Sequence, residues 1–146
     1  MSWYPHVTVA TVVEDAGRFL LVEEYADGKL VFNQPAGHLE QNETLIEAAQ
    51  RETLEETGWS VEILGLVGVG LYTAPSNAVT YYRTCFFAKP LRHDPERKLD
   101  AGIERAVWLS FAEITALTQR LRSPLVATVI AQYLDGHRYP LSSIFS

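Results

Sequence analysis

The alternation of hydrophobic and polar positions predicts a chain of β-strands interrupted by one strongly helical segment. Residues 7–13 (VTVATVV) are rich in β-branched side chains and predict a buried strand. Residues 18–24 and 30–33 predict two more strands, with Asp27-Gly28 as a hairpin turn between them. Further strands are predicted within residues 60–73, 79–88 and 106–109, and a long polar loop over residues 89–102.

Residues 44–57 have a different pattern, with good helix formers and no Gly or Pro. Thr44 and Glu47 have the spacing of a capping box at the start of a helix. Gly58 follows as the residue that ends it in a left-handed conformation. Two shorter helices are predicted near the C-terminus, over residues 111–117 and from Pro124 to residue 134.

The resulting order of elements is β-β-β-α-β-β-β-α-α, with few crossover helices. This order predicts an α+β domain, or a sandwich, built on a mixed sheet. The length of 146 residues predicts a single domain spanning residues 1–146.

Composition narrows the classes of function. The formal net charge of −6 disfavours binding to a nucleic acid polymer, which needs an excess of Lys and Arg. No apolar run approaches the roughly 20 residues of a membrane span, and the N-terminus does not resemble a signal peptide. The only cysteine, Cys85, is interpreted as a small buried hydrophobic residue. We therefore expect a cytoplasmic protein, monomeric or homodimeric, without nucleic acid or membrane partners.

Three glutamates on the central helix form the candidate chemical site. Glu52, Glu55 and Glu56 stand at i, i+3 and i+4 and span an arc of about 100°. The apolar stripe of the same helix runs into this arc, so that Glu56 points nearly the same way as Leu45. Like charges at these spacings repel, and buried carboxylates without partners are costly. A divalent cation such as Mg²⁺ would remove both costs, whereas a solvated acidic face remains the alternative on these three residues alone.

The wider segment, residues 37–59, resembles the signature of the Nudix hydrolases, G-x5-E-x7-R-E-U-x-E-E-x-G-U, where U is apolar. Thr53 occupies the first apolar position, a mild departure from the pattern, and Trp59 fills the last. The remaining defined positions match at their required spacing and are Gly37, Glu43, Arg51, Glu52, Glu55, Glu56 and Gly58.

This resemblance implies an α/β/α sandwich in which a mixed, curved sheet is flanked by helices. It also implies a diphosphate-cutting enzyme that uses Mg²⁺, with Mn²⁺ as an alternative ion. The implied metal ligands are Glu52, Glu55 and Glu56, joined by a backbone carbonyl of Ala36 or Gly37.

The resemblance gives supporting and catalytic roles to further residues. Glu43 and Arg51 are expected to pair with each other or with the metal-binding glutamates and to steady the loop and helix. The general base that activates water is expected to be a signature glutamate, Glu55 or Glu52, or a carboxylate on a later loop, Glu104. The alternative for Glu104 is an ordinary exposed acid.

Segments outside the signature resemble one branch of the family, the NudJ-type phosphatases. They are residues 6–13, residues 33–40 (NQPAGHLE), residues 121–127 (LRSPLVA), Tyr133 and residues 138–141. This branch implies nucleoside di- and triphosphates, or thiamine-pathway pyrophosphates such as hydroxymethylpyrimidine pyrophosphate and thiamine pyrophosphate, as small-molecule substrates. Orthophosphate is the expected main product.

Recognition of the organic group is expected to come from residues outside the signature. His38, Arg122 and Arg138 are candidates for phosphate contacts, with a solvent-exposed turn residue or surface ion pairs as the alternatives. The aromatic candidates for stacking on a ring, each with a core position as its alternative, are Phe32, Tyr72 and Tyr81. The competing class of function is a non-catalytic Nudix module that binds a nucleotide and regulates a partner.

Overall fold

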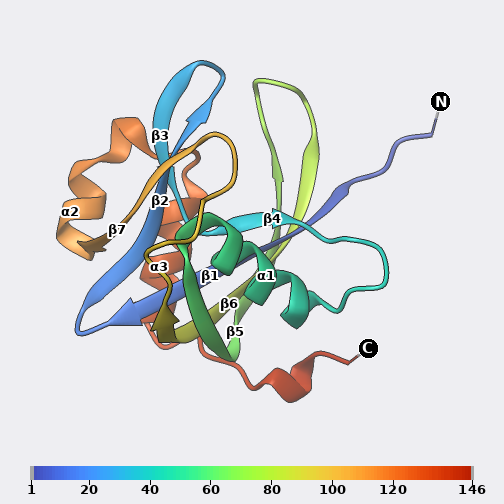
Figure 1. Ribbon diagram of the computed structural model, residues 1–146. Helices are drawn as coiled ribbons and strands as arrows, with labels where there is room; N and C mark the ends of the chain where they lie inside the picture. The colour runs from blue at the N-terminus through green and yellow to red at the C-terminus, as the bar shows by residue number, and fades with distance from the viewer. Residues whose placement is uncertain (1, 146) are drawn as a thin grey trace.

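The computed structural model describes residues 2–145 and contains seven strands and three α-helices over that range (Figure 1). The strands are β1 (His6–Asp15), β2 (Arg18–Ala26), β3 (Lys29–Asn33), β4 (Ala36–His38), β5 (Trp59–Thr73), β6 (Thr80–His93) and β7 (Ile103–Ser110). The helices are α1 (Leu45–Thr57), α2 (Phe111–Ala116) and α3 (Leu125–Leu134). Short 3₁₀ turns cover Thr118–Arg120 and Leu141–Ser143.

The sheet is mixed, as the order of elements predicts. Its main path runs β3-β2-β1-β6-β5, with β4 added on β1 and β7 added on β2. Strand β1 runs parallel to β6, and every other strand pair is antiparallel. Strand β1 pairs with β2 only at Glu14 and Asp15, whereas it follows β6 from His6 to Val13. The two halves of the sheet therefore diverge away from that short junction.

Helices cover both faces of this sheet (Figure 1). A separate hydrophobic cluster lies between the sheet and the helices on each face. Ala48 and Ala49 of α1 pack with Val9, Leu20 and Phe86 on one face. On the other face α3 packs through the buried residues Val126, Val129, Ile130 and Tyr133. The three layers make the predicted α/β/α sandwich.

Local sequence signals explain how α1 begins and ends. The Thr44 hydroxyl accepts a hydrogen bond from the Glu47 amide, and the Glu47 side chain accepts one from the Thr44 amide. Gly58 ends the helix with φ 76°, and its N–H donates to the Leu54 carbonyl. Both features of the predicted capping are confirmed, and together they fix the rotation of the glutamate face.

The predicted loop over residues 89–102 is partly wrong, because β6 continues to His93. Strand β6 loses β1 as a neighbour after Ala88 and beyond that point pairs only with β5, with Pro90 opposite Val61. A proline lacks a donor and is tolerated where a strand has one free side. The short strand β4, which directly follows Pro35, is absent from the sequence-based prediction. No helix within residues 2–145 combines the length and apolar character that crossing a membrane requires.

Candidate active site

The glutamate face of α1 meets the protein interior at Glu56. This residue is 9% exposed and lies on the same buried stripe as Ala49 and Thr53, as the helical periodicity predicts. Its Oε1 accepts a hydrogen bond of 3.0 Å from the backbone N–H of Ala36, at the start of β4. The carboxyl group is therefore buried with a single hydrogen bond from the described residues.

Burial changes the proton affinity of this part of the helix. It raises the pKa of Glu56 to about 9, and the carboxylates of Glu24, Glu52 and Asp100 act in the same direction against the Ala36 hydrogen bond. Burial also raises the pKa of Glu52. Both groups would be ionised more easily beside a positive charge.

Gly37 lies against this face of α1. A side chain at Gly37 would overlap the Glu52 carboxyl group, which would have to move to make room for it. The backbone of β4 thus lies directly against the carboxylates that the helix presents.

Arg51 links the signature loop to the helix. Its guanidinium forms a two-pronged ion pair with Glu43, with Nε donating to Oε2 at 2.6 Å and Nη2 donating to Oε1 at 3.0 Å. Its Nη1 donates to Glu52 Oε1 at 2.7 Å and to Glu55 Oε1 at 2.8 Å, and its Nη2 also reaches the His38 carbonyl. The Arg51 hydrogen bonds lower the pKa of Glu43. Arg51 thus contacts both Glu43 and two of the signature glutamates.

A fourth acid, Asp100, joins the cluster from the segment that leads into β7. Its backbone N–H donates to the Glu55 carbonyl at 3.1 Å, which holds this segment over the end of α1 (Figure 1). Carboxylate oxygens of Glu52, Glu55 and Asp100 all lie within 4.8 Å of one another. Burial and the Glu55 charge raise the pKa of Asp100. Such a set of oxygen donors could hold a divalent cation.

Asp100 does not figure in the sequence-based prediction, whose loop carboxylate is Glu104. The sequence signal available for it is one acid among several in a polar loop. Glu104 itself is exposed at the start of β7 and is not part of the three-carboxylate cluster.

A second charged group lies between the two halves of the sheet. Arg122 Nη1 donates to Glu24 Oε2 at 2.8 Å, and Asn33 Nδ2 donates to the same oxygen at 3.2 Å. Arg83 of β6 completes the chain, with Nη2 donating to Asn33 Oδ1 at 3.4 Å. We call these four residues the Arg83–Arg122 cluster. Of the four, only Arg122 is among the sequence-based candidates, although Arg83 stands out as a charge in an otherwise inward-facing position between Tyr81 and Cys85.

A cavity of about 330 Å³ adjoins this cluster and brings two predicted residues together. Tyr72 of β5 and Arg122 both line it, alongside Leu121, Pro124 and Ala127 at the start of α3. Its lining combines one aromatic ring, aliphatic groups and one cation, a mixture typical of sites for small organic molecules.

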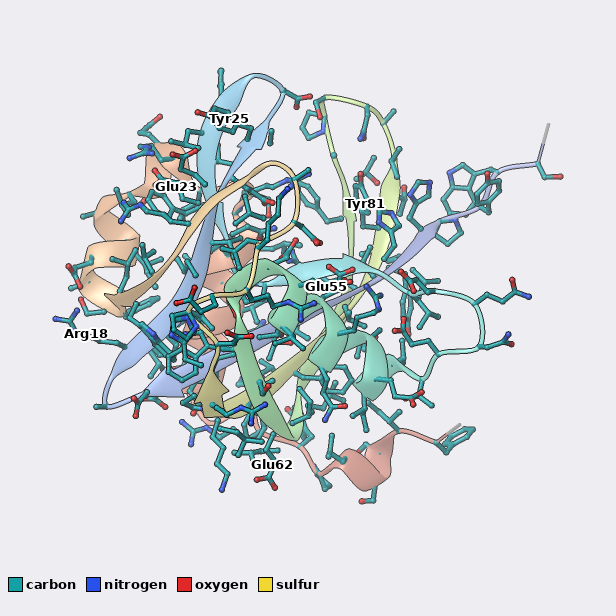
Figure 2. The ribbon with its side chains drawn as sticks, in the orientation of Figure 1. Arg18, Glu23, Tyr25, Glu55, Glu62 and Tyr81 are labelled. Atoms are coloured by element: carbon teal, nitrogen blue, oxygen red, sulfur yellow. The ribbon has the colours of Figure 1, made fainter. Side chains whose placement is uncertain are left out.

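His38 and Tyr81 form a separate aromatic group with His6. A ring nitrogen of His38 lies 3.0 Å from a ring nitrogen of His6, and the Tyr81 ring lies 6.2 Å from the His38 ring between centroids. Figure 2 shows Tyr81 near the N-terminal segment.

Phe32 and Arg138 have partners within the protein. Phe32 is 3% exposed in the core, with the Arg120 guanidinium 4.8 Å from its ring centroid, which fits the structural alternative stated for it. The Arg138 guanidinium lies 4.0 Å from the ring centroid of Tyr133 on α3. Neither is joined to the glutamate face by a hydrogen bond or ion pair among residues 2–145.

Comparisons with known proteins agree with this geometry. Residues 4–129 match the NUDIX domain family. The phosphatase NudJ of Escherichia coli is 45% identical over 140 residues, which are 96% of this chain and 90% of the relative. A solved NUDIX hydrolase from Nitrosomonas europaea has a TM-score of 0.95 and 46% identity, and the match covers 98% of this chain and 97% of that one. With the family match, the shared fold and the signature residues gathered on one face of α1, the chain belongs to the Nudix family of hydrolases.

Proposed function

We propose that this protein hydrolyses a diphosphate linkage in a small phosphorylated molecule and releases orthophosphate, with Mg²⁺ bound at the glutamate face of α1. The observation that carries the proposal is the convergence of Glu52, Glu55 and Asp100 within 4.8 Å, beside the buried Glu56. The relative named phosphatase NudJ, 45% identical over nearly the whole chain, supports phosphate release.

The residues present fit a hard divalent cation. All side-chain donors are carboxylates, which Mg²⁺ prefers, and Mn²⁺ accepts the same set. Burial raises the pKa of Glu56 to about 9, and a divalent cation beside it would favour the ionised form. We assign Glu52, Glu55 and Glu56 as the ligands, with the Gly37 or Ala36 carbonyl and Asp100 as additional oxygen donors.

When bound, Mg²⁺ neutralises diphosphate charge and lowers the pKa of a bound water. The protein groups then position the reactants and move the proton. A water oxygen forms a bond to the terminal phosphorus, and a carboxylate accepts the water proton. The bond from that phosphorus to the bridging oxygen breaks, and the remaining phosphate leaves with the organic group. Glu43 and Arg51 keep the carboxylates in place through the ion pairs described above.

Glu55 is our first assignment for the base. Its carboxylate belongs to the three-acid cluster, and 30% of its side chain is exposed, so water reaches it. Glu104 remains the competing assignment, because the segment that carries it adjoins the end of α1. Glu52 is the third, with 13% of its side chain exposed.

The organic group is assigned to the cavity lined by Tyr72 and Arg122. Its size and its aromatic wall suit a pyrimidine or purine ring, which covers both nucleoside di- or triphosphates and the thiamine-pathway pyrophosphates. His38 and Tyr81 are assigned to the approach to the site, whereas Phe32 and Arg138 are weaker candidates because of their partners within the protein.

The test is phosphate release from a panel of nucleotides, hydroxymethylpyrimidine pyrophosphate and thiamine pyrophosphate, with Mg²⁺ and with a chelator. We expect turnover that needs the metal and falls by orders of magnitude in Glu56→Gln. Glu62→Gln is the matched control, because Glu62 is an exposed acid of β5 that lies apart from Glu55 (Figure 2). If the wild-type protein turned over no member of the panel, the non-catalytic binding module would be the better interpretation.

A further inference from the structure

Arg83 is a partly buried cation whose partners among the described residues do not satisfy it. Its Nε is fully buried and lacks a hydrogen-bond partner among residues 2–145. Among the same residues its side chain forms one hydrogen bond, from Nη2 to Asn33 Oδ1. At 3.4 Å this bond is long. A guanidinium offers five donors and stays charged in proteins, so a site that buries it usually provides an anion.

The cluster does not provide a free carboxylate to pair with Arg83. The Arg83–Arg122 cluster contains two guanidinium groups and a single carboxylate, Glu24, which is already paired with Arg122 at 2.8 Å. Asn33 is neutral. The cluster therefore has a surplus of positive charge in a protein of net charge −6. Burial lowers the pKa of Arg83, the direction expected for a cation short of compensating charge.

The structure also leaves room beside Arg83. In the β5–β6 ladder its direct partner is Gly70, and the next residue on the same face, Cys85, is opposite Gly68. A side chain built at either glycine would meet nothing within 4 Å. Residues directly opposite in a sheet share a face, so the two glycines leave open the surface onto which Arg83 projects.

The position of the cluster relates it to both parts of the proposed site. Arg122 belongs to the cluster and also lines the cavity assigned to the organic group. Asn33, also in the cluster, lies three residues before Ala36, whose backbone N–H donates to Glu56. The cluster thus adjoins the cavity and is joined to the metal-binding face by a short stretch of chain.

We propose that Arg83 and Arg122 form a binding site for a phosphate group, namely the substrate phosphate attached to the organic part and adjacent to the one that water attacks. This inference rests on the proposed function for the identity of the substrate. Asn33 and Glu24 hold the two guanidinium groups in position. The site makes the enzyme specific for two consecutive phosphates, because a single phosphate at the metal would leave Arg83 without its anion.

The test measures binding of methylenediphosphonate, a diphosphate analogue with a carbon bridge that hydrolysis does not cleave, by titration calorimetry in Mg²⁺. We expect Arg83→Met to weaken binding about 10- to 100-fold, the range for losing a charged hydrogen-bond donor. Arg83→Lys keeps the positive charge but loses the planar, forked set of donors, and it should weaken binding of the analogue less than Arg83→Met does. Arg18→Met is the matched control, because Arg18 is exposed, its only side-chain hydrogen bond among residues 2–145 goes to the Trp108 carbonyl, and it lies far from Tyr81 and Glu55 (Figure 2).

Two further measurements separate this proposal from others. Binding of Mn²⁺ alone should be the same in Arg83→Met and wild type, which shows that the metal-binding face is intact. If Arg83→Met does not fold, Arg122→Met replaces it, because 47% of the Arg122 side chain is exposed, and the same weakening is expected. Unchanged binding of the analogue in a folded Arg83 variant, or no binding to wild type, would overturn the phosphate site. Binding does not require turnover, so this result is independent of whether the proposed hydrolysis is observed.

Discussion

Replacing Glu56 by Gln should make the metal-free protein more stable while it removes activity. In the folded, metal-free protein the pKa of Glu56 is raised by burial from its usual 4.5 to about 9. The folded state therefore keeps a proton on Glu56 across a pH range in which the unfolded chain has released it. Gln has the shape of the protonated acid, its amide oxygen can accept the Ala36 hydrogen bond, and it has no proton to lose.

The sign and size of the effect follow from proton linkage. Below pH 4.5 both states hold the proton, and Glu56 does not disfavour folding. Between pH 4.5 and about 9 only the folded state holds it, so the free energy of unfolding of wild type falls as pH rises. At pH 7 the accumulated loss is about 3 kcal/mol, from roughly 1.4 kcal/mol per pH unit. Glu56→Gln recovers this loss, which corresponds to a rise in Tm of roughly 10 °C for a chain of this length.

The assay is thermal unfolding of both proteins in a chelator at pH 5, 7 and 8, repeated with Mg²⁺. We expect the stability advantage of Glu56→Gln to grow with pH in the chelator, and the Mg²⁺-dependent rise in Tm to be larger for wild type. Glu62→Gln should behave as wild type throughout, since that side chain is about half exposed. A variant no more stable than wild type at pH 8 without metal would refute the assignment of Glu56 as a buried group that needs a cation.

Three further predictions concern the surroundings of Glu56. Gly37→Ala should lower kcat at least about 100-fold with a smaller effect on Tm, because the added methyl group overlaps the Glu52 carboxyl group and displaces it, as steady-state kinetics and thermal unfolding would show. Arg51→Met should lower the unfolding free energy by about 3 kcal/mol, since it leaves the half-buried Glu43 without its two-pronged partner; denaturant titration measures this, and an unchanged midpoint would contradict it. Glu104→Gln should leave the pH–rate profile unchanged if Glu55 is the base, whereas loss of the acidic limb would assign the base to Glu104.

Much of this site could be predicted because its information is local. The cap residues Thr44 and Gly58 determine where α1 begins and ends, and the helical repeat then places Glu56 on the buried stripe. The resemblance to the Nudix signature implies that Arg51 and Glu43, eight residues apart, pair with each other or with the metal-binding glutamates. The structure bears out these local features because each depends on residues within about fifteen positions of one another.

The residues that could not be predicted reach the site through long-range pairing. Asp100 lies at the site because its backbone N–H donates to the Glu55 carbonyl. Strands β5 and β6 separate these two residues in the sequence. The extension of β6 to His93, which the polar composition of residues 89–93 conceals, depends on pairing with β5 alone. Neither contact produces a periodic pattern in the sequence, because each depends on which segments become neighbours in the folded protein.

The divergence of β1 from β2 accounts for the position of both charged groups. Because β1 pairs with β2 only at Glu14 and Asp15 and otherwise follows β6, the far end of β2 separates from β1. Glu24 lies at that end of β2, and Arg83 enters from β6, so opposite charges can meet between the two halves without disrupting either hydrophobic core. The parallel pairing of β1 with β6 thus leaves the far end of β2 free of β1, and the charged side chains of Glu24, Arg83 and Arg122 gather there outside the two apolar cores.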